Sequence, residues 1–330
     1  MSDNIQARRG LQIALGIVWL LDAALQFQPF MFGRGFATQI IEPAAAGDPG
    51  PVARPLLWSA HLMAAHPVAC NAAFAVVQLA IAVGLLVPRT VRPALAVSVA
   101  WALGVWWLGE GLGGTLTGAS PLSGAPGAVV LYALIAWLVW PGAETRERAV
   151  PRVAWSALWG GFAVYLLLPA NRAADAVSQV FAGAGAGEPG WIRALDRALA
   201  GLTAGHGLAV SVLLAGLCLI AGAAVGVRSL TRPGLVLAGL LGLLFWVAQA
   251  FGGLATGMAT DPNSGPLLIL LAACFWPAAA EPAAESAALN GVGAEAAGVS
   301  GCRSARADPT HGEGPRVLPV RRARGSRRAA

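Results

Sequence analysis

Residues 11–31 read LQIALGIVWLLDAALQFQPFM, an apolar run that contains one charged residue, Asp22. A helix of this length spans about 30 Å, the thickness of the hydrocarbon core of a bilayer. Arg8 and Arg9 before it resemble the start of a signal peptide. The run is longer than the roughly 7–15 apolar residues of such a peptide, and no small-residue cleavage site follows directly. The stretch is therefore predicted to be an uncleaved membrane-spanning helix.

The composition of the whole chain agrees with a membrane protein. Of 330 residues, 57% are hydrophobic and 12% are charged, whereas soluble domains carry about 25% charged residues. The net charge is +6 and every basic side chain is Arg, but eight of the 22 arginines lie in the last 28 residues and the others flank apolar segments. This placement indicates membrane topology, and it excludes nucleic acid as a partner.

The apolar segments predict an all-α polytopic membrane protein of about eight transmembrane helices. The predicted spans are residues 11–31, 67–87, 93–109, 122–140, 153–170, 206–227, 234–251 and 265–279. Arginines concentrate in alternate short connections and in the C-terminal tail, which places both termini in the cytoplasm. The absence of Lys and the abundance of Ala, Gly and Arg are typical of a high-GC bacterium, hence a bacterial plasma membrane.

An internal repeat relates the two halves at an offset of 140 residues. Matched pairs include Trp19 with Trp159, Pro29 with Pro169, His66 with His206, and Arg92 with Arg232. Each half has an even number of predicted spans, so both halves enter the membrane in the same direction. The expected architecture is two parallel four-helix bundles side by side.

These patterns divide the chain into five parts. A cytoplasmic N-terminus (1–10) precedes the first four-helix unit (11–141), and a cytoplasmic linker (142–152) leads to the second unit (153–279). The remainder (280–330) is rich in Ala, Gly, Glu, Pro and Arg and is predicted to be a disordered basic cytoplasmic tail. Within the two long outer loops, residues 51–64 and 191–204 are predicted to form helices at the membrane interface.

Asp22 is the clearest candidate for a working residue, because ionisable groups inside a bilayer are costly. Trp19, Asp22, Gln26 and Pro29 share one helix face. The second half has Phe162 and Leu166 in place of Asp22 and Gln26, so a site is expected in the first half alone. Two interpretations stay open: a functional acid, or an aspartate that hydrogen-bonds a neighbouring helix.

Glu110 is the third intramembrane polar candidate, at the outer end of the third predicted span. The segment Gly109–Gly114 satisfies the pattern GxGxxG, but it follows a membrane helix and no βαβ unit surrounds it. A dinucleotide site is therefore rejected, and the glycines are expected to allow turns or close packing.

A run of imidazole and sulfur side chains lies at the outer end of the second predicted span. Such ligands suit copper(I). The candidate metal ligands are His61, Met63, His66, Cys70 and, from the second half, His206. Interfacial histidines that bond to backbone or water are the alternative interpretation.

The half-repeat resembles the DoxX/DoxD-like group of four-helix bacterial membrane proteins. The resemblance rests on Leu15–Pro29 (LGIVWLLDAALQFQP), the QLAIAVGLL core within Asn71–Leu86, and the Arg-Pro-Ala-Leu start at Arg92–Leu95. It implies a redox or quinone-linked accessory or scaffold subunit, with quinone as cofactor and a membrane enzyme as partner, and no self-contained catalytic activity. A small-solute or proton transporter and copper handling at the outer face are the alternatives.

Overall fold

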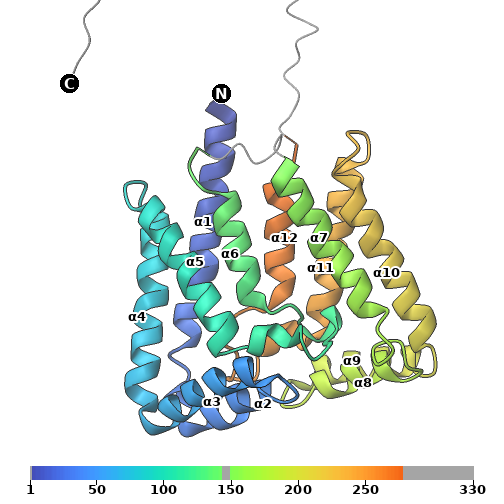
Figure 1. Ribbon diagram of the computed structural model, residues 1–330, viewed down its shortest axis with the longest axis horizontal. Coiled ribbons are helices and arrows are strands. Elements are labelled where there is room, and N and C mark those ends of the chain that lie inside the picture. The colour runs from blue at the N-terminus through green and yellow to red at the C-terminus, as the bar shows by residue number, and fades with distance from the viewer. Residues whose placement is uncertain (1, 143–148, 278–330) are drawn as a thin grey trace, which may run out of the picture. The chain divides into compact units, whose positions relative to one another are not determined.

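The computed structural model describes residues 2–142 and 149–277 (Figure 1). The predicted tail at 280–330 and part of the linker at 142–152 lie outside these ranges. The described chain is all-helical, as predicted, with no strand. Its twelve α-helices are α1 (Ser2–Leu25), α2 (Glu42–Ala44), α3 (Gly50–Ala65), α4 (Pro67–Leu86), α5 (Val91–Leu108), α6 (Ala128–Leu138), α7 (Ala149–Leu166), α8 (Ala176–Ala184), α9 (Gly190–Thr203), α10 (Gly207–Ala224), α11 (Thr231–Ala248) and α12 (Ser264–Cys274).

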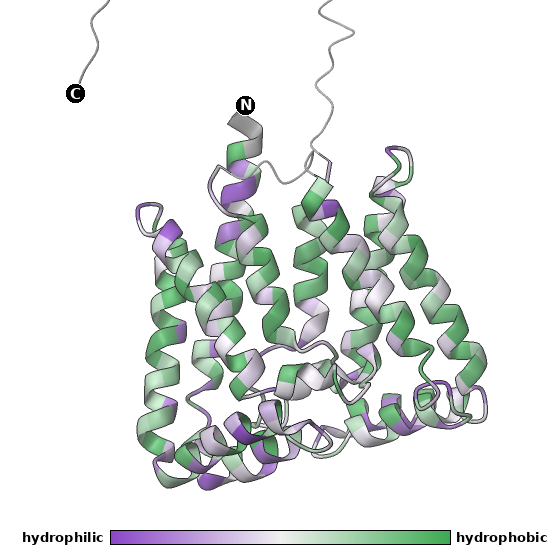
Figure 2. Ribbon diagram, in the orientation of Figure 1, coloured by the Kyte–Doolittle hydropathy of each residue, from purple (hydrophilic) through white to green (hydrophobic). Residues whose placement is uncertain are grey.

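Four helices, α4, α5, α10 and α11, are long and apolar enough to cross a membrane. Figure 2 shows hydrophobic residues along the long helices and hydrophilic residues gathered at their ends and in the connections. The exposed side chains on these helices are largely apolar, as at Val76, Val97 and Leu240. Such surfaces suit lipid, so the chain is membrane-embedded.

Two predicted spans are shorter than expected. Instead of helices over 122–140 and 265–279, the structure has the 11-residue helices α6 and α12, each about 16 Å long. The connection before α6 contains Pro121, Pro126 and several glycines with positive φ, and these residues form turns instead of helix. The hydropathy of residues 122–140 as a whole is high, so hydropathy alone did not predict these turns.

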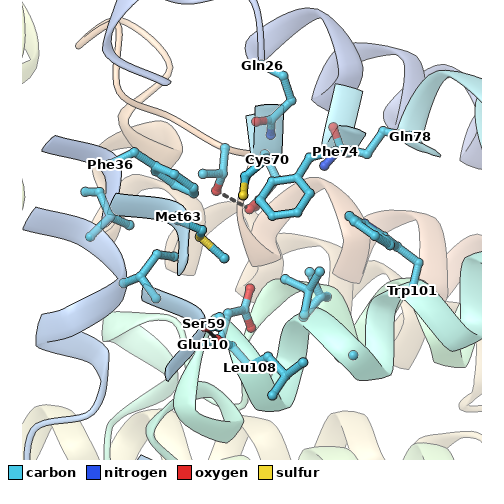
Figure 3. A pocket seen from close by; sticks show the side chains of 18 of the residues that line it. Gln26, Phe36, Ser59, Met63, Cys70, Phe74, Gln78, Trp101, Leu108 and Glu110 are labelled. Carbon is cyan, nitrogen blue, oxygen red and sulfur yellow. Dashed lines mark hydrogen bonds between the residues drawn. The ribbon is translucent and has the colours of Figure 1, made fainter. Parts of the chain in front are cut away.

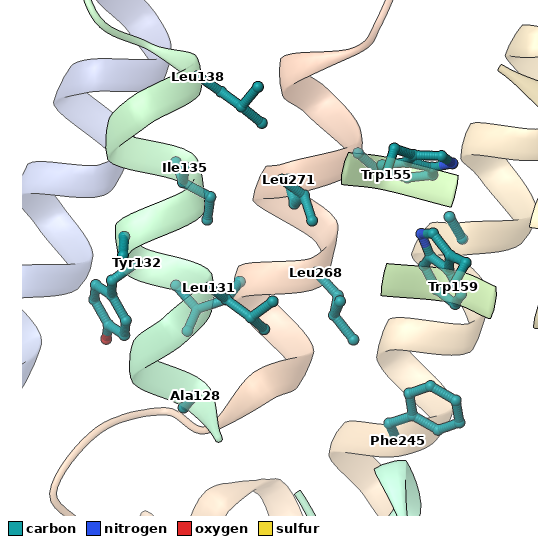
Figure 4. Packing of buried hydrophobic residues seen from close by; sticks show 14 of the residues in the cluster. Ala128, Leu131, Tyr132, Ile135, Leu138, Trp155, Trp159, Phe245, Leu268 and Leu271 are labelled. Carbon is teal, nitrogen blue, oxygen red and sulfur yellow. The ribbon is translucent and has the colours of Figure 1, made fainter. Parts of the chain in front are cut away.

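The short helices α6 and α12 pack against each other, with α5 beside α6 and α11 beside α12. Figure 4 shows Leu131 and Ile135 of α6 near Leu268 and Leu271 of α12; all four are fully buried. Outside this pair, α1 packs on α4 and α7 packs on α10. One continuous apolar core therefore runs through both halves.

A left-handed turn follows α5, and another follows α11. Residues Gly111–Gly114 have φ values between 56° and 69°, and Ala250–Gly253 have values between 47° and 75°. Glycine adopts this conformation without cost, whereas other residues are strained by about 1–2 kcal/mol each. Beside each turn a tryptophan indole donates to a proline carbonyl: Trp106 to Pro126 at 2.6 Å and Trp246 to Pro262 at 2.8 Å.

The connections that follow these turns cross to the opposite half. The Asn171 amide, just after α7, donates to the Gly118 carbonyl at 2.8 Å. In the reverse direction, the Gln28 amide, just after α1, donates to the Ala259 carbonyl at 2.9 Å. Each half is thus held by a loop of the other.

The helices predicted over 51–64 and 191–204 are present as α3 and α9. Figure 1 shows them with α2 and α8 at one end of the helix array, while the α4–α5 and α10–α11 turns lie at the other end. Trp58 of α3 and Trp191 of α9 are about two-thirds exposed, as interfacial anchors are.

The left-handed turn yields a stability prediction. Gly113 has φ +61°, and an added Cβ there would collide with the Pro126 carbonyl. Gly113→Ala should therefore destabilise the protein by at least about 2 kcal/mol, read as a lower melting temperature in detergent. Gly216→Ala in α10, where a Cβ meets nothing within 4 Å, is the matched control and should melt unchanged or slightly higher. Equal melting of both variants would contradict this account of the turn.

Candidate functional site

A cavity of about 340 Å³ is bounded by α1, α3, α4 and α5 of the first half and by the connection before α12 in the second half. All three intramembrane polar candidates, Asp22, Gln26 and Glu110, line it. Figure 3 shows Gln26 and Glu110 in the wall of the cavity with Phe36, Phe74 and Trp101. The structure therefore brings together side chains that lie almost ninety residues apart in the sequence.

The face of α1 predicted from the sequence is buried. Asp22 and Gln26 are each 2% exposed, and the Trp19 indole between them and the core donates to the Ser98 hydroxyl at 3.0 Å. The Asn71 amide fixes the end of the helix by donating to the Gln26 carbonyl at 2.7 Å. The Tyr132 hydroxyl of α6 lies within hydrogen-bonding reach of the Asp22 carboxyl group, and Gln26 Oε1 has no hydrogen-bond partner among the described residues.

Glu110 reaches the cavity because the chain reverses directly after it. The left-handed turn at Gly111–Gly114 carries the backbone back toward α6 and leaves Glu110 against Gly127, which precedes that helix. Gly127 has φ +98°, which favours glycine, and a Cβ there would overlap Glu110 Oε2 in its present position. The Val129 backbone N–H lies beside the Glu110 carboxyl group, and Oε2 has no other partner among the described side chains and backbone groups.

A third carboxyl group, Asp261, enters the cavity from the second half and was not predicted. Its Oδ1 accepts from the Asn263 backbone N–H at 2.7 Å, and its Oδ2 accepts from the Thr260 hydroxyl at 2.8 Å. Burial raises the pKa of Asp261, and these hydrogen bonds offset the rise only in part. One signal was present in the sequence: Asp261 is the only acidic residue between Asp196 and Glu281.

Apart from these groups and the side chains of Gln78, Ser59, Thr260 and Cys70, the cavity wall is aromatic and apolar. The rings of Phe74 and Trp101 lie edge to face with centroids 5.5 Å apart. The Ser59 hydroxyl donates to backbone carbonyls of Leu56 and Leu108, so its proton is already used. Among the described residues that line the cavity, none is Arg, Lys or His.

The metal candidates do not assemble into a site in the described part of the chain. Met63 and Cys70 line the cavity, but His61 and His66 are exposed. His206 is exposed as well, and its Nδ1 lies 2.7 Å from the Ala204 carbonyl of its own turn. Residues 2–142 and 149–277 contain no group of three His, Cys, Asp or Glu side chains that could hold a metal ion.

Comparison with protein-family models, curated proteins and solved structures finds no match for this chain. The geometry of the cavity therefore carries the functional argument.

The raised pKa of Asp261 predicts a pH-dependent stability. The folded protein holds the Asp261 proton more tightly than the unfolded chain, so the free energy of unfolding falls as pH rises from about 4 through the folded-state pKa. Asp261→Asn removes this contribution and keeps an oxygen acceptor for the Asn263 N–H. The variant should be more stable than the wild type by about 1 kcal/mol or more at pH 8, with the difference shrinking toward pH 4. Melting curves between these pH values test this, and a difference that is constant with pH would contradict it.

Proposed function

We propose that the chain crosses a bacterial plasma membrane eight times, as two parallel four-helix repeats with both termini in the cytoplasm. The spans are α1, α4, α5 and α6 in the first repeat and α7, α10, α11 and α12 in the second. Matched local geometry supports the repeat: each half has a left-handed turn, a tryptophan bonded to a proline carbonyl, and a loop that contacts the other half.

The distribution of arginine supports the orientation. Arg89 and Arg92 belong to the α4–α5 end of the array, and Arg228 and Arg232 belong to the α10–α11 end. Figure 1 draws these turns at the same end as the start of α1. Basic residues in short connections mark the cytoplasmic side.

The orientation is tested by labelling single cysteines in a variant without the native thiols. Ala46, in the α2–α3 turn, and Arg89, in the α4–α5 turn, are both exposed. A membrane-impermeant maleimide should label Ala46→Cys in intact cells and Arg89→Cys only after the membrane is disrupted. The reverse pattern would contradict the orientation, and labelling of both in intact cells would contradict a span between them.

For the function itself, we propose that the cavity binds a small amphipathic molecule and exchanges it for protons, as a transporter of a small solute does. The observation that supports this proposal is that three carboxyl groups, Asp22, Glu110 and Asp261, line one cavity with aromatic side chains in its wall. Asp22 and Glu110 were predicted from the sequence as intramembrane candidates, and Asp261 is the third acid. Carboxyl groups that meet in a water-poor cavity can hold and release protons as a ligand leaves and arrives.

The second candidate is the quinone-linked accessory role implied by the DoxX-like resemblance. A quinone headgroup is planar and apolar with polar edges, and a cavity with aromatic walls and a few polar groups suits it. In this role Asp22 and Gln26 contact the headgroup, and a membrane enzyme is the partner. Copper handling has the least support, because the three histidines are exposed whereas Met63 and Cys70 line the cavity.

A cavity-filling variant tests whether the cavity is the working site. Gly104 lines the cavity, and an added Cβ there meets nothing within 4 Å. Gly104→Leu should therefore fill the cavity without disturbing the fold, whereas Gly216→Leu in α10 is the matched control. Mass spectrometry of molecules extracted from the purified proteins should find the bound compound in the wild type and the control but not in Gly104→Leu.

The same preparations separate the two candidates. Solute-dependent proton release in liposomes that Gly104→Leu abolishes indicates transport, and enrichment of quinone without proton movement indicates the accessory role. A bound compound retained at equal level in Gly104→Leu would contradict both.

A further inference from the structure

We infer that the ligand of this cavity is a lipophilic organic cation, such as a protonated amine or a phosphonium bearing apolar groups. This inference rests on the proposed binding function of the cavity and names the class of molecule. It follows from the charge of the walls, their aromatic faces, and the surface through which the cavity opens.

The walls carry acidic charge that no side chain balances. Asp22, Glu110 and Asp261 face the cavity from α1, from the end of α5 and from the connection before α12. The other titratable groups beside them are Tyr132 of α6 and Cys70 of α4, and neither supplies positive charge. A buried carboxylate without a counter-charge is strongly disfavoured, so either a proton or a bound cation must neutralise each one.

The unpartnered atoms have the polarity that a cation or hydrogen-bond donor requires. Buried oxygens of Asp22, Gln26, Gln78 and Glu110 have few or no partners in the described chain. These oxygens are acceptors or anionic groups in their usual states, and the donors near them are the amide N–H groups of Gln26 and Gln78 and the Tyr132 hydroxyl beside Asp22. None of these donors is charged, so a cation neutralises the carboxyl groups where a neutral ligand does not.

The size and lining of the cavity point to an organic cation and not a metal ion. A volume of about 340 Å³ holds a drug-sized molecule, and the described carboxyl groups do not converge into a metal site. Phe36, Phe74 and Trp101 line the cavity, and an aromatic ring attracts a cation placed over its face by about 0.5–2 kcal/mol.

The opening is apolar. Trp58 and Leu62 of α3 and Ile40 line the cavity and are also exposed, by 63%, 43% and 37%. They form a route from the membrane interface that favours a lipophilic molecule over a hydrated ion.

The test compares methyltriphenylphosphonium with triphenylphosphine oxide, which is similar in shape but uncharged. Binding to the full chain in nanodiscs is followed by quenching of tryptophan fluorescence. The cation should bind more tightly than the oxide, and its Kd should rise as pH falls because protons compete for the carboxylates. Asp22→Asn and Glu110→Gln should each weaken binding of the cation about tenfold or more, and Trp101→Leu by about threefold to tenfold.

Glu188→Gln is the matched control. Glu188 is also a buried, unpartnered carboxyl group, but it lies in the second half and does not line the cavity, so this variant should bind the cation as the wild type does. Equal binding of cation and oxide, unaffected by Asp22→Asn, would overturn the cation inference and leave the binding function standing. No binding of either compound, or of a quinone, would count against the proposed function itself.

Discussion

The hydrogen bond from the Gln28 side chain to the Ala259 carbonyl joins the end of α1 to a loop of the second half. The composition of the cavity wall depends on this contact between the halves. The loop carries Asp261 to the cavity that Asp22 and Glu110 already line. Asn171 makes the reciprocal bond to Gly118. The second half is thus more than a support for the first, because it contributes a carboxyl group to the site.

Burying carboxyl groups costs free energy, and the backbone around them is built to hold them in place. Carboxyl groups in a low-dielectric interior require neutralisation, and no basic side chain lies among the described residues of the cavity wall. The first half holds such groups in place with glycine at Gly127 and with a left-handed turn at Gly111–Gly114. The second half has a similar turn, with Gln249 in place of Glu110. The Gln249 side-chain amide donates a hydrogen bond to the Pro121 carbonyl and accepts one from the Ser264 hydroxyl. Equivalent backbone therefore supports a candidate binding site in one half and a satisfied packing contact in the other.

The sequence predicted what depends on local pattern. Helix periodicity was sufficient to put Asp22 and Gln26 on one face, and hydropathy predicted helical, membrane-embedded structure. Hydropathy overestimated the lengths of α6 and α12, because apolar composition does not reveal the turns formed around Pro121 and the neighbouring glycines. The position of Glu110 in the wall of the cavity that Asp22 lines depends on backbone with positive φ, and the position of Asp261 depends on contacts between the halves. Neither has a periodic signature.

The central claim is that the two halves build one cavity, and a cross-link between α1 and the loop before α12 tests it most directly. In a variant without native thiols, Gln28→Cys and Ala259→Cys should be joined in intact membranes by oxidation or by a short bifunctional thiol reagent. After the chain is cleaved within residues 143–148, the two cross-linked fragments should migrate together on a denaturing gel, at the size of the uncleaved chain. Rapid linkage is the predicted result. Fragments that separate completely would contradict the composite cavity, provided that a Gln12→Cys and Val139→Cys pair within the first half loses its free thiols under the same conditions.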